Sequence, residues 1–121
     1  FIALVKEEVS NLNDGTTTIA TTYITGGPAK NWCYWNGTGT LAIRDSFNTS
    51  SVTDLGTGNY LVNVASGFQA APGHLGFGSL AGFCASGGDN TTSNYYVAQW
   101  NSSGTLTDAS RMNGAAFGDL A

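Results

Sequence analysis

The residues best suited to do chemistry in this chain are one histidine and a set of scattered aspartates. His74 is the only histidine, and no serine or acid lies next to it in the sequence. A serine hydrolase also needs a sharp turn that presents its nucleophile, and the chain has no G-x-S-x-G motif. We therefore interpret His74 as a hydrogen-bonded structural residue at a loop edge, and not as a catalytic base.

Paired carboxylates would indicate glycan hydrolysis, in which one acid protonates the leaving group and the other acts as base or nucleophile. Most of the aspartates lie beside glycine, serine or threonine, where an aspartate commonly bonds its own backbone in a turn. They are Asp14, Asp45, Asp54, Asp89, Asp108 and Asp119. No glutamate follows Glu8. This pattern favours a protein that is not an enzyme.

Metal binding is not indicated by the acids or by the cysteines. Calcium takes six to eight oxygen ligands, and the glycine-rich segment 54–59 offers only the carboxylate of Asp54, so we expect a hairpin turn there. Cys33 and Cys84 are too few for a zinc site. They either pair or are small buried hydrophobic residues, and we prefer the second interpretation. We predict no metal and no cofactor.

A binding surface for sugars is the remaining possibility, because glycan recognition uses aromatic platforms flanked by amides and carboxylates. We predict such a site in the strand 95–100 and the loop before it. Its members are Tyr95, Tyr96, Trp100, Asp89 and Asn90. Neighbouring residues of a strand point to opposite faces, so at least one of the two tyrosines should be exposed or lie in a subunit interface. The alternative is that these aromatic residues belong to the core or to intersubunit contacts.

Length and charge limit the classes of protein that remain. The chain has 121 residues, enough for one ordinary domain, and only 10% of them are charged. The net charge is −4 and the four basic residues are scattered, so we expect no nucleic-acid binding. No apolar run approaches the length of about 18 residues that a spanning helix needs, so we expect no membrane insertion.

The N-terminal segment 1–12 has the spacing of an amphipathic helix. Ile2, Val5, Val9 and Leu12 lie three, four and three residues apart, as in the seam of a coiled coil. Such a short helix is not stable alone, so it must pack on its own domain or on copies of itself. We prefer a helical stalk over residues 1–13, followed by one domain over residues 14–121. We also read the chain as the C-terminal piece of a longer polypeptide.

The rest of the chain has the pattern of an all-β protein. We expect strands in 16–25, 30–36, 38–47, 50–54, 59–65, 74–84 and 95–100, then 105–112 pairing back and a short strand in 115–120. Strands and turns at this spacing, about ten residues, are typical of a sandwich or barrel. We predict an antiparallel β-sandwich, jelly-roll-like, of about eight strands. Both faces of 30–36 are apolar, with Cys33 and Trp35 opposite Trp32 and Tyr34, so we expect both to be covered.

Three consecutive motifs carry a resemblance to a known family. They are NGTGTLAIR at 36–44, SFNTSSVTD at 46–54 and GTGNYLVN at 56–63. They resemble a β-rich domain near the C-terminal end of bacteriophage tail-fibre and related virion proteins, notably of marine phages. The segments 101–108 and 117–119 look like the last hairpin of that domain, and the resemblance covers roughly residues 13–119.

This resemblance implies a non-enzymatic structural protein, the distal domain of a homotrimeric tail fibre that attaches to a host-surface glycan or protein receptor. It also implies contacts with other virion structural proteins, and assembly in the host cytoplasm, where disulfides are rare. The fibre resemblance is what favours three strands in the stalk. Alternatives are a capsid head fibre or decoration protein and a polysaccharide-degrading tail spike. A secreted bacterial adhesion module is a further alternative, and it predicts a Cys33–Cys84 disulfide.

Overall fold

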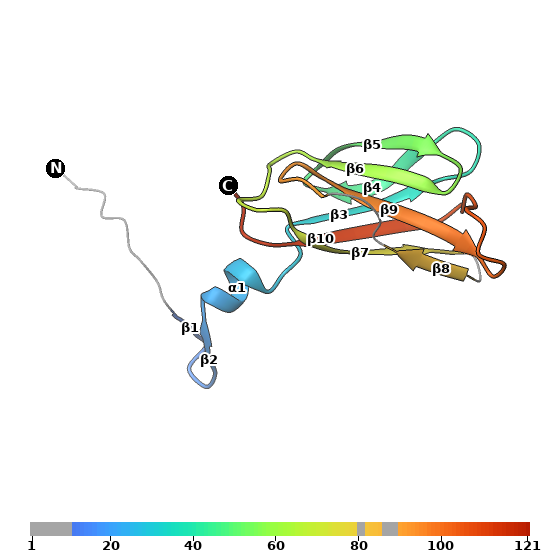
Figure 1. Cartoon of the computed structure of the whole chain (residues 1–121). Helices are drawn as coiled ribbons and strands as arrows, with labels where there is room; N and C mark the ends of the chain where they lie inside the picture. Colours follow the sequence, from blue (N-terminus) through green and yellow to red (C-terminus); the bar gives the residue numbers. More distant parts are fainter. Residues whose placement is uncertain (1–10, 80–81, 86–89) are drawn as a thin grey trace.

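The computed structural model describes residues 11–79, 82–85 and 90–121, and these are mostly strands in antiparallel sheets (Figure 1). The all-β expectation is therefore confirmed. The elements in chain order are β1 (Asn11–Asn13), β2 (Thr18–Ala20), α1 (Thr22–Gly26), β3 (Asn31–Asn36), β4 (Ala42–Phe47), β5 (Thr49–Gly56), β6 (Asn59–Val64), β7 (Gly73–Gly78), β8 (Gly82–Ala85), β9 (Asn94–Asn101) and β10 (Met112–Phe117).

Two four-stranded sheets hold most of these strands. One has the order β4-β3-β10-β7 and the other β5-β6-β9-β8, while β1 and β2 form a separate hairpin. The core lies between the inward faces of the two sheets, because every second residue of β3, β6 and β9 is buried there. Its largest fully buried side chains include Trp35, Tyr60, Tyr95, Phe68 and Met112.

The strands with clear alternation lie where the sequence predicts them. Tyr60, Val62 and Val64 all face the core, with 0%, 0% and 7% of each side chain exposed. The glycines of β7 also behave as expected, since they allow close approach of the facing sheet. A Cβ atom on Gly76 would lie 2.6 Å from Cγ1 of Val97 in β9.

The predicted strand 16–25 is wrong after Ala20, because Thr22–Gly26 forms the helix α1. In the described part of the chain no strand lies opposite this segment, so its amides bond to carbonyls within it. The amides of Ile24 and Thr25 both donate to the carbonyl of Thr21, at 3.0 Å each. Local hydrogen bonding therefore outweighs the β propensity of its threonines and isoleucine.

The predicted N-terminal helix is wrong at Leu12, which lies in β1 and pairs with Ile19 of β2. The other members of the predicted stalk, Ile2, Val5 and Val9, lie outside the described residues. Gly15 has the left-handed conformation expected of a helix cap (φ +95°), but here it serves the turn of the hairpin. Its amide donates to Oδ1 of Asn13 at 2.6 Å. The domain boundary expected after residue 13 thus falls inside this hairpin.

The segment 105–112 pairs back along β9 only at its start. The amide of Asn101 donates to the carbonyl of Thr105, the amide of Thr107 donates to the carbonyl of Gln99, and a bridge joins Trp100 to Leu106. The chain then crosses to the other sheet, where β10 lies between β3 and β7. The crossing is held by Asp108, whose Oδ1 accepts hydrogen bonds from the amide of Gly58 (2.7 Å) and the hydroxyl of Tyr60 (2.8 Å). The final strand was expected at 115–120, and β10 (Met112–Phe117) lies three residues earlier in the sequence.

Candidate binding surfaces

Tyr95 does not belong to a surface site. Its side chain is fully buried, and its hydroxyl donates a hydrogen bond of 2.6 Å to Oδ1 of Asn31. Burial raises the pKa of this tyrosine above its usual value. The assignment of Tyr95 to a glycan platform is therefore wrong, although the expectation that it and Tyr96 face opposite ways is correct. Asp89 lies outside the described residues.

Asn90 holds a loop in place with its whole amide group. Its Nδ2 donates to Nδ1 of His74 at 2.8 Å and to the carbonyl of Pro72 at 3.5 Å. Its Oδ1 accepts a hydrogen bond from the amide of Tyr96 at 3.4 Å. The described pairing of β8 with β9 ends at Ala98, and the side chain of Asn90 supplies an acceptor for the backbone amide of Tyr96.

His74 contributes to the same hydrogen-bonded loop. Because its Nδ1 accepts from Asn90, its proton lies on Nε2, which is buried. Burial lowers the pKa of this histidine, and its ring lies 5.0 Å from that of Tyr95. A neutral imidazole held in this way is suited to a structural role.

The outward surface of the sheet β5-β6-β9-β8 carries hydroxyls and amides around one aromatic ring. Tyr96 lies opposite Leu61, which lies opposite Thr53. The Nδ2 of Asn63 donates to Oγ of Ser51 and to Oγ1 of Thr53, both at 3.0 Å. We call this surface the polar face. Its residues are Ser51, Thr53, Leu61, Asn63, Asn94 and Tyr96.

Of the predicted glycan residues that the structure describes, Tyr96 and Trp100 face outward from β9, and both are half-buried. Trp100 lies beside the turn 101–106, through its bridge to Leu106. Sequence reasoning missed the members of the polar face on β5 and β6. The available signal was a partial alternation, because the polar Asn63 lies between the buried Val62 and Val64, whereas Leu61 on the same face is apolar.

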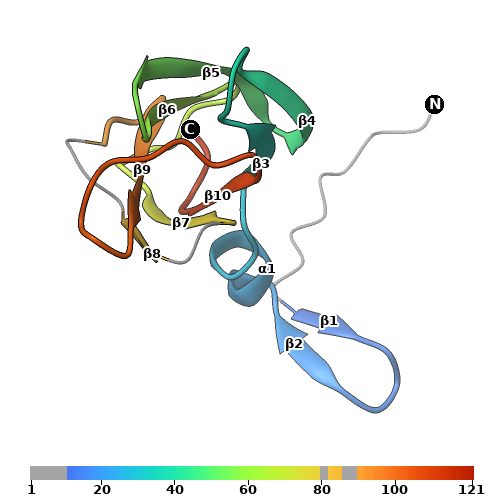
Figure 2. The same cartoon turned by 90° about the vertical axis from the view of Figure 1, so that its right-hand side faces the viewer.

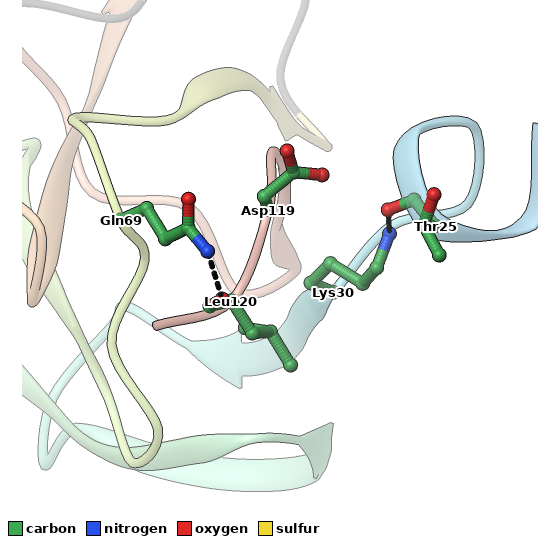
Figure 3. A pocket seen from close by; sticks show the side chains of 5 residues that line it. All are labelled: Thr25, Lys30, Gln69, Asp119 and Leu120. Carbon is green, nitrogen blue, oxygen red and sulfur yellow. Dashed lines mark hydrogen bonds between the residues drawn. The ribbon is translucent and has the colours of Figure 1, made fainter. Parts of the chain in front are cut away.

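A pocket of about 410 Å³ lies where the end of α1 meets the C-terminal residues. Figure 3 shows Thr25, Lys30, Gln69, Asp119 and Leu120 around it. The ammonium of Lys30 donates to the carbonyls of Thr25 and Pro28, and Nε2 of Gln69 donates to the carbonyl of Leu120. These hydrogen bonds lie on either side of the pocket, within 25–30 and between Gln69 and Leu120, and none that is described crosses it.

The outward surface of the other sheet, β4-β3-β10-β7, carries an apolar patch. One row of paired residues crosses all four strands, from Phe47 through Trp32 and Ala115 to Leu75. Phe77 lies on the same side, one row away. We call the surface formed by Trp32, Phe47, Leu75, Phe77 and Ala115 the apolar face.

The described residues leave the apolar face uncovered. The exposed fractions are 39% for Trp32, 54% for Phe47, 52% for Leu75 and 60% for Phe77. Sequence reasoning expected both sides of β3 to be covered, and among the residues that the structure describes only the side of Cys33 and Trp35 is.

The other residues that could react or bind a metal do not form a cluster. Cys33 and Cys84 are free thiols, and burial raises the pKa of Cys33 to about 11. Oδ1 of Asp54 accepts a hydrogen bond of 2.9 Å from the amide of Gly56, which forms a turn. Within residues 11–79, 82–85 and 90–121, no three histidines, cysteines or acids come together as metal ligands. None of the helices in these ranges is long and apolar enough to cross a membrane.

Comparison with known proteins gives no relative. No protein-family model, no curated protein and no solved structure matches the chain.

Proposed function

We propose that this chain is a host-attachment domain of a virion appendage, the distal domain of a homotrimeric phage tail fibre. The virion setting rests on the resemblance carried by segments 36–44, 46–54 and 56–63. We also propose that the two facing sheets form a β-sandwich. It is jelly-roll-like in the sense that eight strands divide equally between two antiparallel sheets.

The observation that carries the attachment role is the chemistry of the polar face. Tyr96 shares this face with the amides of Asn63 and Asn94, and the hydroxyls of Ser51 and Thr53 lie on β5, beyond β6. A sugar presents apolar C–H groups on one side of its ring and hydroxyls around its edge. An aromatic side chain packs against the first, and amides and hydroxyls pair with the second. The proposed ligand is therefore a neutral host-surface glycan.

The mechanism is multivalent adhesion. A single shallow site on a sheet binds a sugar weakly, because few of the sugar's groups are desolvated. Three sites on one fibre raise the effective concentration for the second and third contacts, and avidity then exceeds the affinity of each site by about 10²-fold or more. No catalytic step is needed.

The test measures binding of residues 1–121 to isolated host-surface polysaccharide by biolayer interferometry. Tyr96→Ala should weaken binding at least tenfold, whereas Leu120→Ala, which removes an exposed apolar side chain outside the polar face and the apolar face, should leave it unchanged. Equal binding by wild type and Tyr96→Ala would show that the polar face is not the receptor site.

Two further readouts separate the alternatives of tail spike and head fibre. Release of oligosaccharides from the polysaccharide would identify a tail spike, and its absence with retained binding supports a fibre. Electron cryo-microscopy of intact particles locates the domain on the tail or on the capsid.

A further inference from the structure

The segment 11–27, which contains β1, β2 and α1, has no buried residue. All its residues are exposed apart from Ala20 and Thr21, which are half-buried. Figures 1 and 2 show it projecting from the two sheets. We call this segment the arm.

The arm exposes large apolar side chains from each of its elements. Leu12 of β1 is 49% exposed and pairs with Ile19 of β2, which is 46% exposed. On α1, Tyr23 is 72% exposed and Ile24 is 44% exposed. Surface positions this apolar, gathered in one short segment, are characteristic of a contact surface.

The arm is too small to be stable without such a contact. Its strands have three residues each and its helix has five. A two-stranded hairpin or a single helical turn is marginal in water, because too few hydrogen bonds offset the loss of chain entropy. The arm must therefore pack on a surface that residues 11–79, 82–85 and 90–121 of its own chain do not supply.

The apolar face of the sheet β4-β3-β10-β7 matches the arm in size. If a fully exposed large side chain offers roughly 200 Å², the four large residues of the face expose roughly 400 Å². The four apolar residues of the arm expose a similar area, also roughly 400 Å². A stable interface buries about 800 Å² on each partner, and somewhat more than half of that is apolar.

Charge does not oppose this pairing. Asp14 at the tip of the hairpin is the only charged residue of the arm. Arg44 borders the apolar face, where its Nη1 donates to the hydroxyl of Tyr34 at 2.7 Å. Asp45 lies opposite Tyr34 and offsets the charge of Arg44, so apolar area is what favours the pairing.

We propose that the apolar face of each chain is covered by the arm of a second copy of this chain, so that copies assemble by exchanging arms. The contact is heterologous, arm to face, and closes into a ring when the rotation allows it. This inference names the subunit interface of the proposed fibre, and it rests on the proposed function only for the number of copies.

The first test is the solution mass of residues 1–121 by light scattering at low micromolar concentration. Wild type should be an oligomer. Two double variants should each weaken association at least tenfold and give monomers. The face variant carries Leu75→Ser and Phe77→Ser, and the arm variant carries Tyr23→Ser and Ile24→Ser. Leu55→Ser, which removes an apolar side chain that is 45% exposed on β5, should behave as wild type. Circular dichroism confirms that each variant is folded.

A second test identifies the two surfaces directly. In a Cys84→Ser background, chains carrying Tyr23→Cys are mixed with chains carrying Phe77→Cys and oxidised. Disulfide-linked dimers that need both chains support arm exchange. Linked dimers of the Phe77→Cys chain alone would show face-to-face contact and overturn it.

Other outcomes also overturn the proposal. These are a monomeric wild type, an oligomer that survives either pair of serine substitutions, and dissociation by the face variant but not by the arm variant. Glycan binding is measured separately with Tyr96→Ala. This variant should have the same solution mass as wild type if the polar face and the apolar face are independent. Failure of arm exchange is therefore distinguishable from failure of the attachment function.

Discussion

The hydroxyl of Tyr95 donates a hydrogen bond of 2.6 Å to Oδ1 of Asn31, and this buried bond joins β9 in one sheet to β3 in the other. The Nδ2 of Asn31 is also fully used. It donates to the carbonyls of Phe47 and Asn48, at 3.2 and 2.8 Å, and to Oγ1 of Thr49 at 2.8 Å. One pair of side chains therefore holds both sheets and the tight connection between β4 and β5, where Asn48 is left-handed (φ 53°).

Tyr95→Phe should lower the free energy of unfolding by about 1–2 kcal/mol, because it leaves Oδ1 of Asn31 buried without its donor. Urea denaturation measures the change. The matched control is Tyr34→Phe. The hydroxyl of Tyr34 accepts a hydrogen bond from Arg44 at the surface, so we expect its loss to change the free energy of unfolding by about 0.5 kcal/mol or less. Equal effects of the two substitutions would contradict the role given to the buried bond.

The core could be predicted from the sequence wherever polar and apolar residues alternate. In β6 the apolar positions are two residues apart, and the period of a strand then sets which side chains point inward. The same reasoning identified Cys33 and Trp35 as one face of β3, and both are buried. In these strands the sequence was sufficient to predict which side chains share a face, since the alternation of side chains depends only on backbone geometry.

The arm and the binding surfaces could not be predicted in this way. Whether threonine and isoleucine at 22–25 form a strand depends on a neighbouring strand, which local propensity does not reveal. Alternation placed Tyr95 and Tyr96 on opposite faces, but two identical side chains give no indication of which one the other sheet covers. The exposure of Trp32 likewise depends on tertiary and quaternary packing.

Gly76→Ala should destabilise the fold by about 1–3 kcal/mol, because the added Cβ would lie 2.6 Å from Cγ1 of Val97 in the facing sheet. Val97 is fully buried and β-branched, so it has little freedom to move away. Gly73→Ala in the same strand is the control, since no atom lies within 4 Å of its Cβ position. We expect that change to be neutral or slightly stabilising. Thermal unfolding of the two variants measures the difference in stability. A loss of stability in Gly73→Ala as large as that in Gly76→Ala would contradict the packing argument.

Stability should fall in alkaline solution, between about pH 9 and pH 11. Burial raises the pKa of Cys33 from 9.0 to about 11, and it also raises the pKa values of Tyr60 and Tyr95. Above pH 9 the unfolded chain loses the Cys33 proton while the folded chain keeps it, so unfolding becomes easier as the pH rises. Urea midpoints measured across this range test the sign, and midpoints that stay flat or rise would contradict it. Cys33→Ala should reduce the slope of the midpoint against pH.

Asp108→Ala should cost about 1–3 kcal/mol of stability, because it leaves the amide of Gly58 without its acceptor where the chain crosses between the sheets. The buried hydroxyl of Tyr60 also loses one partner and keeps the carbonyl of Gly37, at 3.0 Å. Asp54→Ala is the control, since Asp54 is exposed and bonds only the nearby amide of Gly56, and we expect a change of about 0.5 kcal/mol or less. Chemical denaturation of the two variants measures the difference. If Asp54→Ala were the more damaging change, the crossing would not depend on Asp108.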